Sequence, residues 1–152
     1  MSTVLVVRHA LAGVREDWNG DDLARPLDER GRRQAAALVP LLADLPVTDV
    51  RSSPARRCTE TVDPLGAARG VAVRTDDALL EDADPAGALA LVRSGTDGLV
   101  LCTHGGLLTP LLRVLVAEGV PADPALDGKG ATWVLDVTDG RVVDARYLPP
   151  PA

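Results

Sequence analysis

Residues 3–7 read Thr3-Val4-Leu5-Val6-Val7, a run of β-branched residues and leucine that has the length of a strand. Unbroken apolar runs of this length are typical of strands covered on both faces, as in the parallel sheets of α/β proteins. Val100–Thr103, inside Gly98–Thr103, repeats the pattern. The two runs predict two buried strands that lie far apart in the chain.

Helical patterns separate these runs. Asp28–Leu45 carries Ala and Leu at helical spacing after an Asp in the N-cap position, and Pro40 predicts a kink or an early end. A second helix is expected to open at Ser53-Pro54, because Ser is a favoured N-cap and Pro a favoured first residue. The alternation continues with a short strand at Val71–Arg74, a helix at Pro85–Arg93 capped by Asp84, and a helix over roughly Leu107–Glu118.

The last third of the chain has a different pattern. Ala131–Val137 and Arg141–Leu148 are strand-like runs joined through Thr138-Asp139-Gly140, which favours a hairpin. We therefore expect an α/β fold: a three-layer sandwich with a mostly parallel central sheet, helices on both faces and an antiparallel addition near the C-terminus. Residues 1–152 are expected to form a single domain, of which 149–152 are an extended tail.

Composition narrows the class of protein. The 152 residues are 46% apolar and 25% charged, as in a globular protein, and no apolar run approaches the roughly 18 residues of a membrane span. A net charge of -6 argues against a nucleic-acid surface. Met1–Val7 is too short and too soon interrupted by charge for a signal peptide. We expect a cytoplasmic protein without nucleic-acid or membrane partners, with a monomer favoured.

The only two cysteines, Cys58 and Cys102, fall in a helix-like and a strand-like run. We expect two buried, reduced thiols rather than a disulfide. Together with the only two histidines, His9 and His104, they match no usual zinc spacing. Neither a metal nor another cofactor is therefore expected.

Each histidine follows one of the two buried strands, in Val7-Arg8-His9 and in Thr103-His104-Gly105-Gly106. The carboxyl ends of the strands border the ligand crevice of an open α/β sheet. Both imidazoles would enter one cleft if the two strands are parallel neighbours. The alternative is that two unrelated polar residues happen to end strands.

A third segment, Val50–Arg57, also runs from a short strand into a helix N-terminus, where backbone N–H groups favour an anion. Arg57 could add a forked guanidinium, whereas Arg56 is expected to be the more solvated of the two. With Arg8, the cleft would hold two arginines and two imidazoles, which suits the oxygens of a phosphoryl group. The alternative for Arg56 and Arg57 is a solvated basic face.

These segments resemble the three signatures of a known family. Arg8-His9-Ala10, Ser53-Pro54-Ala55-Arg56-Arg57 with Thr61, and Thr103-His104-Gly105-Gly106 are similar in order and separation to those of the histidine phosphatase superfamily, the phosphoglycerate mutase-like or RHG group. Arg25-Pro26-Leu27, followed by Glu29-Arg30-Gly31, resembles the small SixA-like branch of phosphohistidine phosphatases. The resemblance implies a phosphoglycerate mutase-like fold. Ala10 departs from the glycine that is usual in the family, which leaves the local backbone conformation open.

The resemblance also implies roles for the four central residues. His9 would be the nucleophile and would have to be neutral, while Arg8, Arg57 and a protonated His104 would surround the phosphoryl oxygens. Water would then release phosphate from the phosphohistidine. The chain would be a metal-independent hydrolase.

Three further residues have two interpretations each. Glu81 occupies the region of the family's general acid, but an acidic loop facing water would look the same. Arg25 is a phosphate-binding candidate by resemblance, or a partner in a surface salt bridge. Trp18 lies in the long loop 10–27 and could line the mouth of the cleft, or it could be a hydrophobic plug under that loop.

The substrate is open among three possibilities. Only about twenty residues separate Thr61 from Glu81, too few for the cap of larger members of the family, so we expect an open cleft that admits a phosphohistidine on another protein. A small phosphate ester or a nucleotide would also fit, and similar domains occur attached to Nudix hydrolases. A module that binds phosphate or phosphohistidine without turnover is the third possibility. A cofactor enzyme is disfavoured because the turn after residue 7 lacks the Gly-x-Gly-x-x-Gly pattern.

Overall fold

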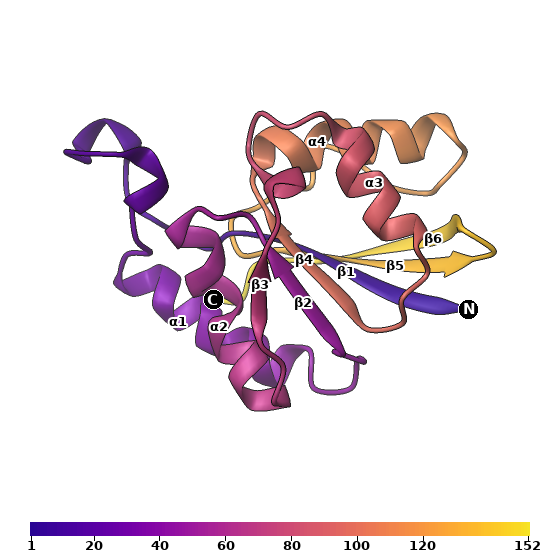
Figure 1. Cartoon of the computed structure of the whole chain (residues 1–152), viewed down its shortest axis with the longest axis horizontal. Coiled ribbons are helices and arrows are strands. Elements are labelled where there is room, and N and C mark those ends of the chain that lie inside the picture. The colour runs from indigo at the N-terminus through magenta and orange to yellow at the C-terminus, as the bar shows by residue number, and fades with distance from the viewer.

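The computed structural model describes residues 1–152 as one six-stranded sheet with helices on both faces (Figure 1). The strand order is β3-β2-β4-β1-β5-β6. The elements are β1 (Ser2–Arg8), η1 (Arg15–Asp17), η2 (Asp22–Ala24), α1 (Glu29–Leu41), β2 (Asp49–Ser52), α2 (Arg56–Arg69), β3 (Val73–Thr75), η3 (Asp77–Leu79), α3 (Pro85–Arg93), β4 (Leu99–Thr103), α4 (Gly105–Ala117), β5 (Thr132–Thr138) and β6 (Arg141–Leu148).

The sheet is parallel on one side of β1 and antiparallel on the other. Strand β1 pairs in parallel with β4, β4 with β2, and β2 with β3, whereas β5 is antiparallel to both β1 and β6. The predicted α/β sandwich with its antiparallel C-terminal addition is therefore confirmed. The hairpin turn has both central residues in the left-handed region, with φ of 52° at Asp139 and 72° at Gly140, as a type I′ turn requires.

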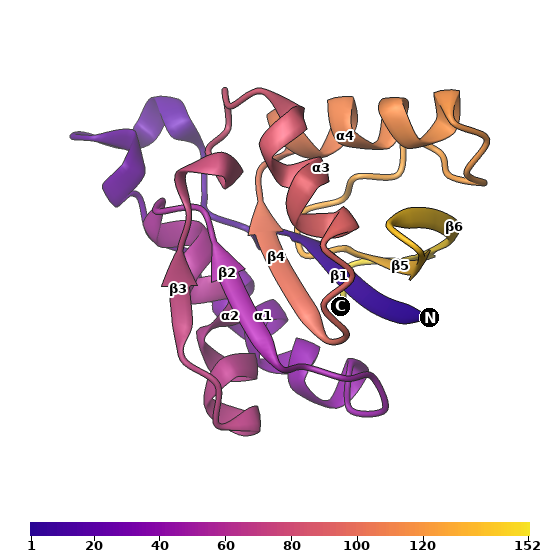
Figure 2. The ribbon, with the colours of Figure 1, turned by 45° about the vertical axis from the view of Figure 1, so that its right-hand side comes forward.

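Two apolar layers hold the sheet between its helices. Helices α1 and α2 cover one face and α3 and α4 the other (Figures 1 and 2). Alternate residues of β1 serve both layers: Leu5 and Val7 pack toward α1 and α2, while Val4 and Val6 pack toward α3 and α4. All four are fully or almost fully buried, and each contributes about 1.5–3 kcal/mol by leaving water.

Several helix ends follow their sequence signals. The carboxylate of Asp28 accepts from the Gly31 N–H at the start of α1 (2.7 Å), and Pro40 stands one residue before the helix ends. Asp84 caps α3 as predicted, with Pro85 as its first residue. An N-cap of this kind stabilises a helix by about 1 kcal/mol.

Two of the boundaries that differ from the predictions have a visible cause. Helix α2 begins at Arg56 instead of Pro54: the Ser53 hydroxyl bonds to His104 at 2.8 Å and accepts from the Ala55 N–H at 3.3 Å, and neither bond reaches an N–H group of the helix. Strand β3 begins at Val73 instead of Val71, because Gly70 ends α2 in a left-handed conformation and the Val71 N–H still bonds back to the Gly66 carbonyl.

Cys58 and Cys102 are buried and unpaired, as predicted. The loop 10–27 projects from the layers as the indigo to violet segment in Figures 1 and 2. None of the helices has the length and apolar character needed to cross a bilayer.

Candidate active site

The two imidazoles lie together at the carboxyl ends of β1 and β4. Arg8 and Thr103 are paired at the ends of these parallel strands, and the His9 N–H donates to the Thr103 carbonyl at 3.0 Å. The ring centroids of His9 and His104 are 5.4 Å apart, with an interplanar angle of 68°. The parallel pairing predicted from the two apolar runs therefore brings both histidines to one place.

The hydrogen bond of His9 fixes which ring nitrogen is available. Nδ1 lies 2.8 Å from the Ala10 carbonyl oxygen, which can only accept, so Nδ1 carries the proton in this arrangement. Nε2 then holds a free lone pair. This is the tautomer that a nucleophilic imidazole needs.

Burial keeps this ring neutral. The pKa of His9 is lowered from 6.5 to about 3, first by desolvation and further by its neighbour His104 and the guanidiniums of Arg57 and Arg8, while the bond to the Ala10 carbonyl acts in the opposite direction. His9 is therefore unprotonated throughout the neutral range, and its lone pair needs no separate base.

This pKa predicts a pH dependence of stability. The folded state binds fewer protons at His9 than the unfolded chain, so full stability is present above pH 6.5 and falls as the pH drops toward 3. Near pH 4.5 the loss from this residue is expected to be roughly 2–3 kcal/mol. The test is urea unfolding of wild type and His9→Asn at about pH 7.5 and 4.5. The drop in free energy of unfolding between these pH values should be smaller in His9→Asn by the same roughly 2–3 kcal/mol. The carboxyl groups are common to both proteins, so equal losses would contradict a buried neutral ring.

The turn after β1 accepts Ala10 without strain. Its side chain is fully buried, its φ is not in the left-handed region, and its N–H donates to the Thr61 hydroxyl at 2.9 Å. Thr61 in turn donates to the Arg57 carbonyl at 2.6 Å. The first and second sequence motifs are thus joined through Thr61, and alanine in place of the usual glycine leaves the geometry intact.

Arg57 is a buried cation beside His104. Its side chain is 1% exposed, and its NH1 and NH2 groups donate to the backbone carbonyl and carboxylate of Asp22, at 2.8 and 3.0 Å. Its Nε has no partner, and neither does the buried Nε of Arg8. Unpaired buried donors are costly in a folded protein. Each of the two guanidiniums therefore keeps one donor that no protein group uses.

His104 is held by three neighbouring side chains. Its Nδ1 lies 3.2 Å from NH2 of Arg57, and its Nε2 lies 2.8 Å from the Ser53 hydroxyl and 3.5 Å from the Cys58 sulfur. Because a guanidinium only donates, Nδ1 must accept, and the ring is neutral in this arrangement. A protonated His104 beside a bound phosphoryl group stays a prediction.

Arg8 lies against the backbone at the start of α4. Its NH1 donates to the Asp127 carbonyl at 2.6 Å. A Cβ on Gly105 would stand 2.8 Å from the Arg8 Cζ, and one on Gly106 would stand 3.0 Å from the Glu81 Cγ and carbonyl oxygen. The two glycines of the third motif therefore make room for a cation and for the segment that carries Glu81.

Glu81 reaches the cleft and is also accessible to water. Its Oε2 accepts from NH2 of Arg15 at 2.7 Å and lies 3.9 Å from NH2 of Arg57, with 41% of the side chain exposed. Thr103 fixes the preceding turn by donating to the Leu79 carbonyl at 2.7 Å. Glu81 thus lies at the cleft as a carboxylate paired with Arg15.

Arg25 is buried and lines the cleft, and its protein contacts are loop carbonyls and Asp22. It donates to the Ala12 and Gly13 carbonyls at 2.7 and 3.4 Å and to the Asp22 carboxylate at 3.2 Å. It is 6% exposed, so its ion pair with Asp22 is not a surface salt bridge. Its contacts tie the two ends of the loop 10–27 together beside the cleft.

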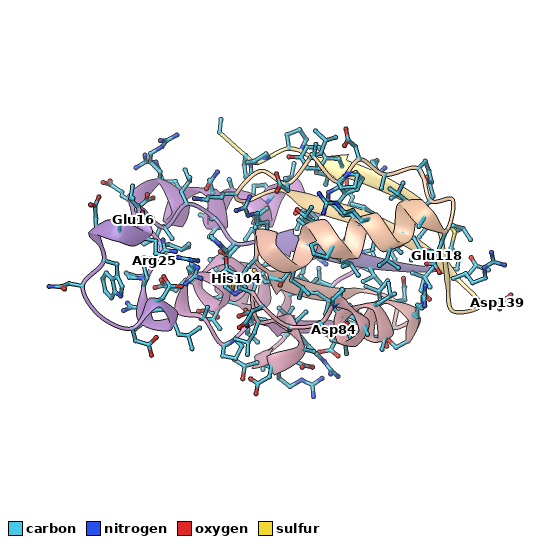
Figure 3. The ribbon with its side chains drawn as sticks, turned by 90° about the horizontal axis from the view of Figure 1, so that it is seen from above. Glu16, Arg25, Asp84, His104, Glu118 and Asp139 are labelled. Carbon is cyan, nitrogen blue, oxygen red and sulfur yellow. The ribbon has the colours of Figure 1, made fainter.

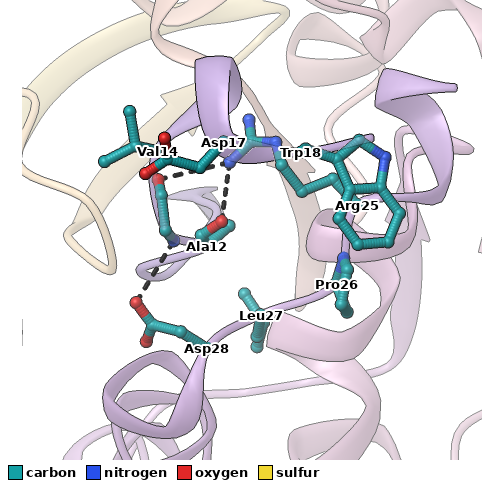
Figure 4. A pocket seen from close by; sticks show the side chains of 9 residues that line it. Ala12, Val14, Asp17, Trp18, Arg25, Pro26, Leu27 and Asp28 are labelled. Atoms are coloured by element: carbon teal, nitrogen blue, oxygen red, sulfur yellow. Dashed lines mark hydrogen bonds between the residues drawn. The ribbon is translucent and has the colours of Figure 1, made fainter. Parts of the chain in front are cut away.

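A cleft of about 330 Å³ opens beside His9, and Arg57 and His104 lie behind its lining residues. Figure 3 shows Arg25 and His104 in the half of the molecule that carries this loop, with Glu118 and Asp139 at the opposite end. The cleft is lined by Arg8, His9, Gly13, Val14, Arg15, Glu16, Arg25, Glu81 and Lys129. Trp18 is not among them and lines a neighbouring hollow (Figure 4).

The model of the histidine phosphatase superfamily (branch 1) matches residues 4–86, more than half of the chain. The chain belongs to the histidine phosphatase superfamily. It is accordingly a hydrolase of the phosphatase class. The matched residues include His9, Arg57 and Glu81.

One curated relative is an 8-oxo-(d)GTP phosphatase of Mycolicibacterium smegmatis (strain ATCC 700084 / mc(2)155), 40% identical over 157 residues. The match covers 98% of this chain and 48% of the relative, so the chain spans about half the length of that protein. The activity named for this relative is therefore that of a longer protein than the chain described here.

Solved structures of other superfamily members share the fold. A proposed phosphohistidine phosphatase SixA from Nakamurella multipartitia is 26% identical, with a TM-score of 0.73 and coverage of 99% of this chain and 97% of that one. The protein histidine phosphatase SixA complexed with tungstate is 20% identical, with a TM-score of 0.75 and coverage of 96% and 94%. The predicted phosphoglycerate mutase-like fold is confirmed.

Sequence reasoning missed three polar residues of this histidine phosphatase site. Arg15 and Lys129 line the cleft, and the Asp22 carboxylate accepts from both Arg25 and Arg57. Burial raises the pKa of Asp22, but the bond from Arg25 and the charges of Arg57 and Arg15 outweigh it and lower that pKa. All three residues come from loops without periodicity, so only the folded arrangement reveals them.

Proposed function

We propose that this chain is a metal-independent phosphatase that transfers a phosphoryl group to Nε2 of His9 and then to water. The observation that carries the proposal is the neutral His9 ring, whose Nδ1–H is held by the Ala10 carbonyl while Nε2 is free. The buried, unpaired cysteines suit a reducing cytoplasm as the place of action.

The proposed reaction has two displacements at phosphorus. In the first, the Nε2 lone pair forms the P–N bond while the bond from phosphorus to the leaving group breaks, and the leaving group takes the electron pair. In the second, a water oxygen attacks phosphorus, the P–N bond breaks, and the electron pair returns to Nε2. Inorganic phosphate leaves, and the proton of the water goes to solvent or to a cleft carboxylate.

In the proposed reaction, Arg8 and Arg57 stabilise the negative charge on the phosphoryl oxygens, and both are held in place by protein contacts before the substrate binds. The unpaired Nε groups of Arg8 and Arg57 support this role, because a phosphoryl oxygen would accept from both. The guanidinium of Arg57 now faces Nδ1 of His104. In the proposed complex a phosphoryl oxygen separates them, and His104 takes up a proton at Nδ1 to donate to it.

Glu81→Gln is expected to separate substrates by their leaving groups. An alkoxide must be protonated as it leaves, whereas the imidazole of a phosphohistidine leaves from a weaker P–N bond. We therefore expect kcat for an alkyl phosphate to fall on the order of 10²-fold or more, and that for a phosphohistidine peptide to change much less. Steady-state rates with the two substrates test this. Equal losses would remove Glu81 as the acid.

A protein phosphohistidine is the first substrate candidate, as in the SixA-like branch. Its support is the open cleft: no inserted segment covers the site between α2 and Glu81, where β3 and η3 follow directly. A phosphorylated side chain on a second protein could reach His9 from solvent.

A nucleoside phosphate is the second candidate. Its support is the 40% identity to the 8-oxo-(d)GTP phosphatase, which extends over 98% of this chain. Lys129 also lines the cleft and forms no ion pair there, whereas Arg15 and Arg25 pair with Glu81 and Asp22, so Lys129 offers a cation for a further phosphate.

A side-by-side assay of phosphate release tests both candidates and the reaction. The substrates are a phosphohistidine protein, an alkyl phosphate, and guanosine and adenosine diphosphates, each with and without a chelator. We expect hydrolysis that the chelator does not change. Loss of all activity with the chelator would contradict the proposed metal-independent reaction.

A further inference from the structure

A second hollow lies beside the cleft and continues from it. Its volume is about 300 Å³, within the lower range of small-molecule sites. Gly13, Val14 and Arg25 line both spaces. The remaining lining residues, most of them drawn in Figure 4, are Ala12, Asp17, Trp18, Pro26, Leu27 and Asp28.

The walls of this Trp18 hollow are mainly apolar, and one of them is an indole ring. Trp18 is 37% exposed, an unusual exposure for a large aromatic side chain. Its Nε1–H donates to the Asp21 carbonyl at 2.9 Å, which holds the edge of the ring and leaves its faces for contact. A fixed indole face is a stacking surface for a planar heteroaromatic ring.

One polar group in the hollow is free to recognise a ligand. The carboxylate of Asp28 is occupied, because it accepts from the Gly13 and Gly31 N–H groups. Asp17 is exposed, and its carboxylate makes no hydrogen bond or ion pair within the protein. A carboxylate accepts two hydrogen bonds side by side, which matches the N1–H and the 2-amino group of guanine and not the edge of adenine.

Arg25 connects the two spaces. Its guanidinium is held on the Ala12 and Gly13 carbonyls and on Asp22, so its charge stands at the boundary between the hollow and the cleft. If a ligand placed its base in the hollow and its phosphates in the cleft, the phosphates would lie next to the Arg25 guanidinium. Phosphate oxygens next to a guanidinium are favourable.

We infer that the Trp18 hollow binds the base of a guanine nucleotide whose terminal phosphoryl group lies at His9. This inference rests on the proposed phosphatase reaction and decides between its two substrate candidates in favour of a nucleoside phosphate. The base stacks on Trp18, Asp17 accepts from its Watson–Crick edge, and the phosphates run past Arg25 to the cleft.

The test compares Trp18→Ala and Trp18→Phe with Leu23→Ala as a matched control. Leu23 is an exposed apolar residue of the same loop that does not line the hollow. We expect Trp18→Ala to raise KM for guanosine 5′-diphosphate about tenfold, Trp18→Phe to restore most of the affinity, and Leu23→Ala to change little. Phosphorylation of His9 by phosphoramidate, which has no base, should be the same in all four proteins.

A second arm uses Asp17→Asn. We expect this variant to raise KM for guanosine diphosphate more than KM for adenosine diphosphate, so that the preference for guanine falls. Binding of guanosine 5′-monophosphate, followed by quenching of tryptophan fluorescence, gives a readout that needs no turnover. The signal should disappear in Trp18→Ala.

The outcomes separate the two proposals. If wild type is not phosphorylated by phosphoramidate, the proposed reaction fails. If phosphoramidate reacts but Trp18→Ala leaves KM for guanosine diphosphate unchanged, or raises KM only for a phosphohistidine protein, the base site fails and the reaction stands. An equal effect of Asp17→Asn on both nucleotides would overturn the guanine preference.

Discussion

Replacing His9 with alanine is expected to abolish turnover, with a fall in kcat on the order of 10⁴-fold or more. The reason is that His9 has the only imidazole nitrogen in this site without a protein partner: both nitrogens of His104 already bond to protein groups, and the Glu81 carboxylate is paired with Arg15. Steady-state phosphate release measures the loss.

The fold should survive this change. His9 is one of two imidazoles at the sheet edge, and the apolar layers of the core do not include it. Circular dichroism and urea unfolding at pH 7.5 serve as the control, and a folded variant with wild-type turnover would exclude His9 as the nucleophile.

Replacing Arg57 with alanine is expected to reduce kcat by about 10²-fold or more, as loss of one fixed charge-stabilising donor does in other enzymes. Arg57 is 1% exposed and contacts His104 directly, so solvent cannot replace it. Arg57→Lys should recover only part of the rate, because an ammonium lacks the planar fork.

Arg56→Ala is the matched control for this variant. Arg56 is the neighbouring residue, but its side chain is 58% exposed and pairs with Glu60 at 3.5 Å. We expect less than about a twofold change in rate and little change in stability. Comparable losses in Arg56→Ala and Arg57→Ala would mean that the general positive charge of this segment matters, and not one positioned guanidinium.

The elements that the sequence predicted well have strong local causes. The α3 cap at Asp84, the end of α1 after Pro40 and the left-handed turn at Asp139-Gly140 each depend on the chemistry of one or two residues. The unbroken apolar runs predicted β1 and β4 as buried strands, while their parallel pairing was the condition for a shared cleft and is found in the structure. These signals also placed His9, His104 and Arg57, because strand ends determine where such side chains lie.

The features that sequence reasoning missed depend on contacts between distant segments. Ser53 has a good capping sequence, but its hydroxyl is used by His104, which comes from another strand. Asp22 contacts Arg57 across 35 residues. The contact of His104 with that same guanidinium joins residues 47 positions apart, so no local pattern could have indicated it.

The most direct measurement of the central claim is to trap the covalent intermediate. Protein mixed with a ³²P-labelled substrate is quenched, and the label is located by peptide mapping. The proposed reaction predicts label on His9 that is stable in base and labile in acid, and no label in His9→Ala. Rapid phosphate release from wild type without any such label, or label on a residue other than His9, would contradict it.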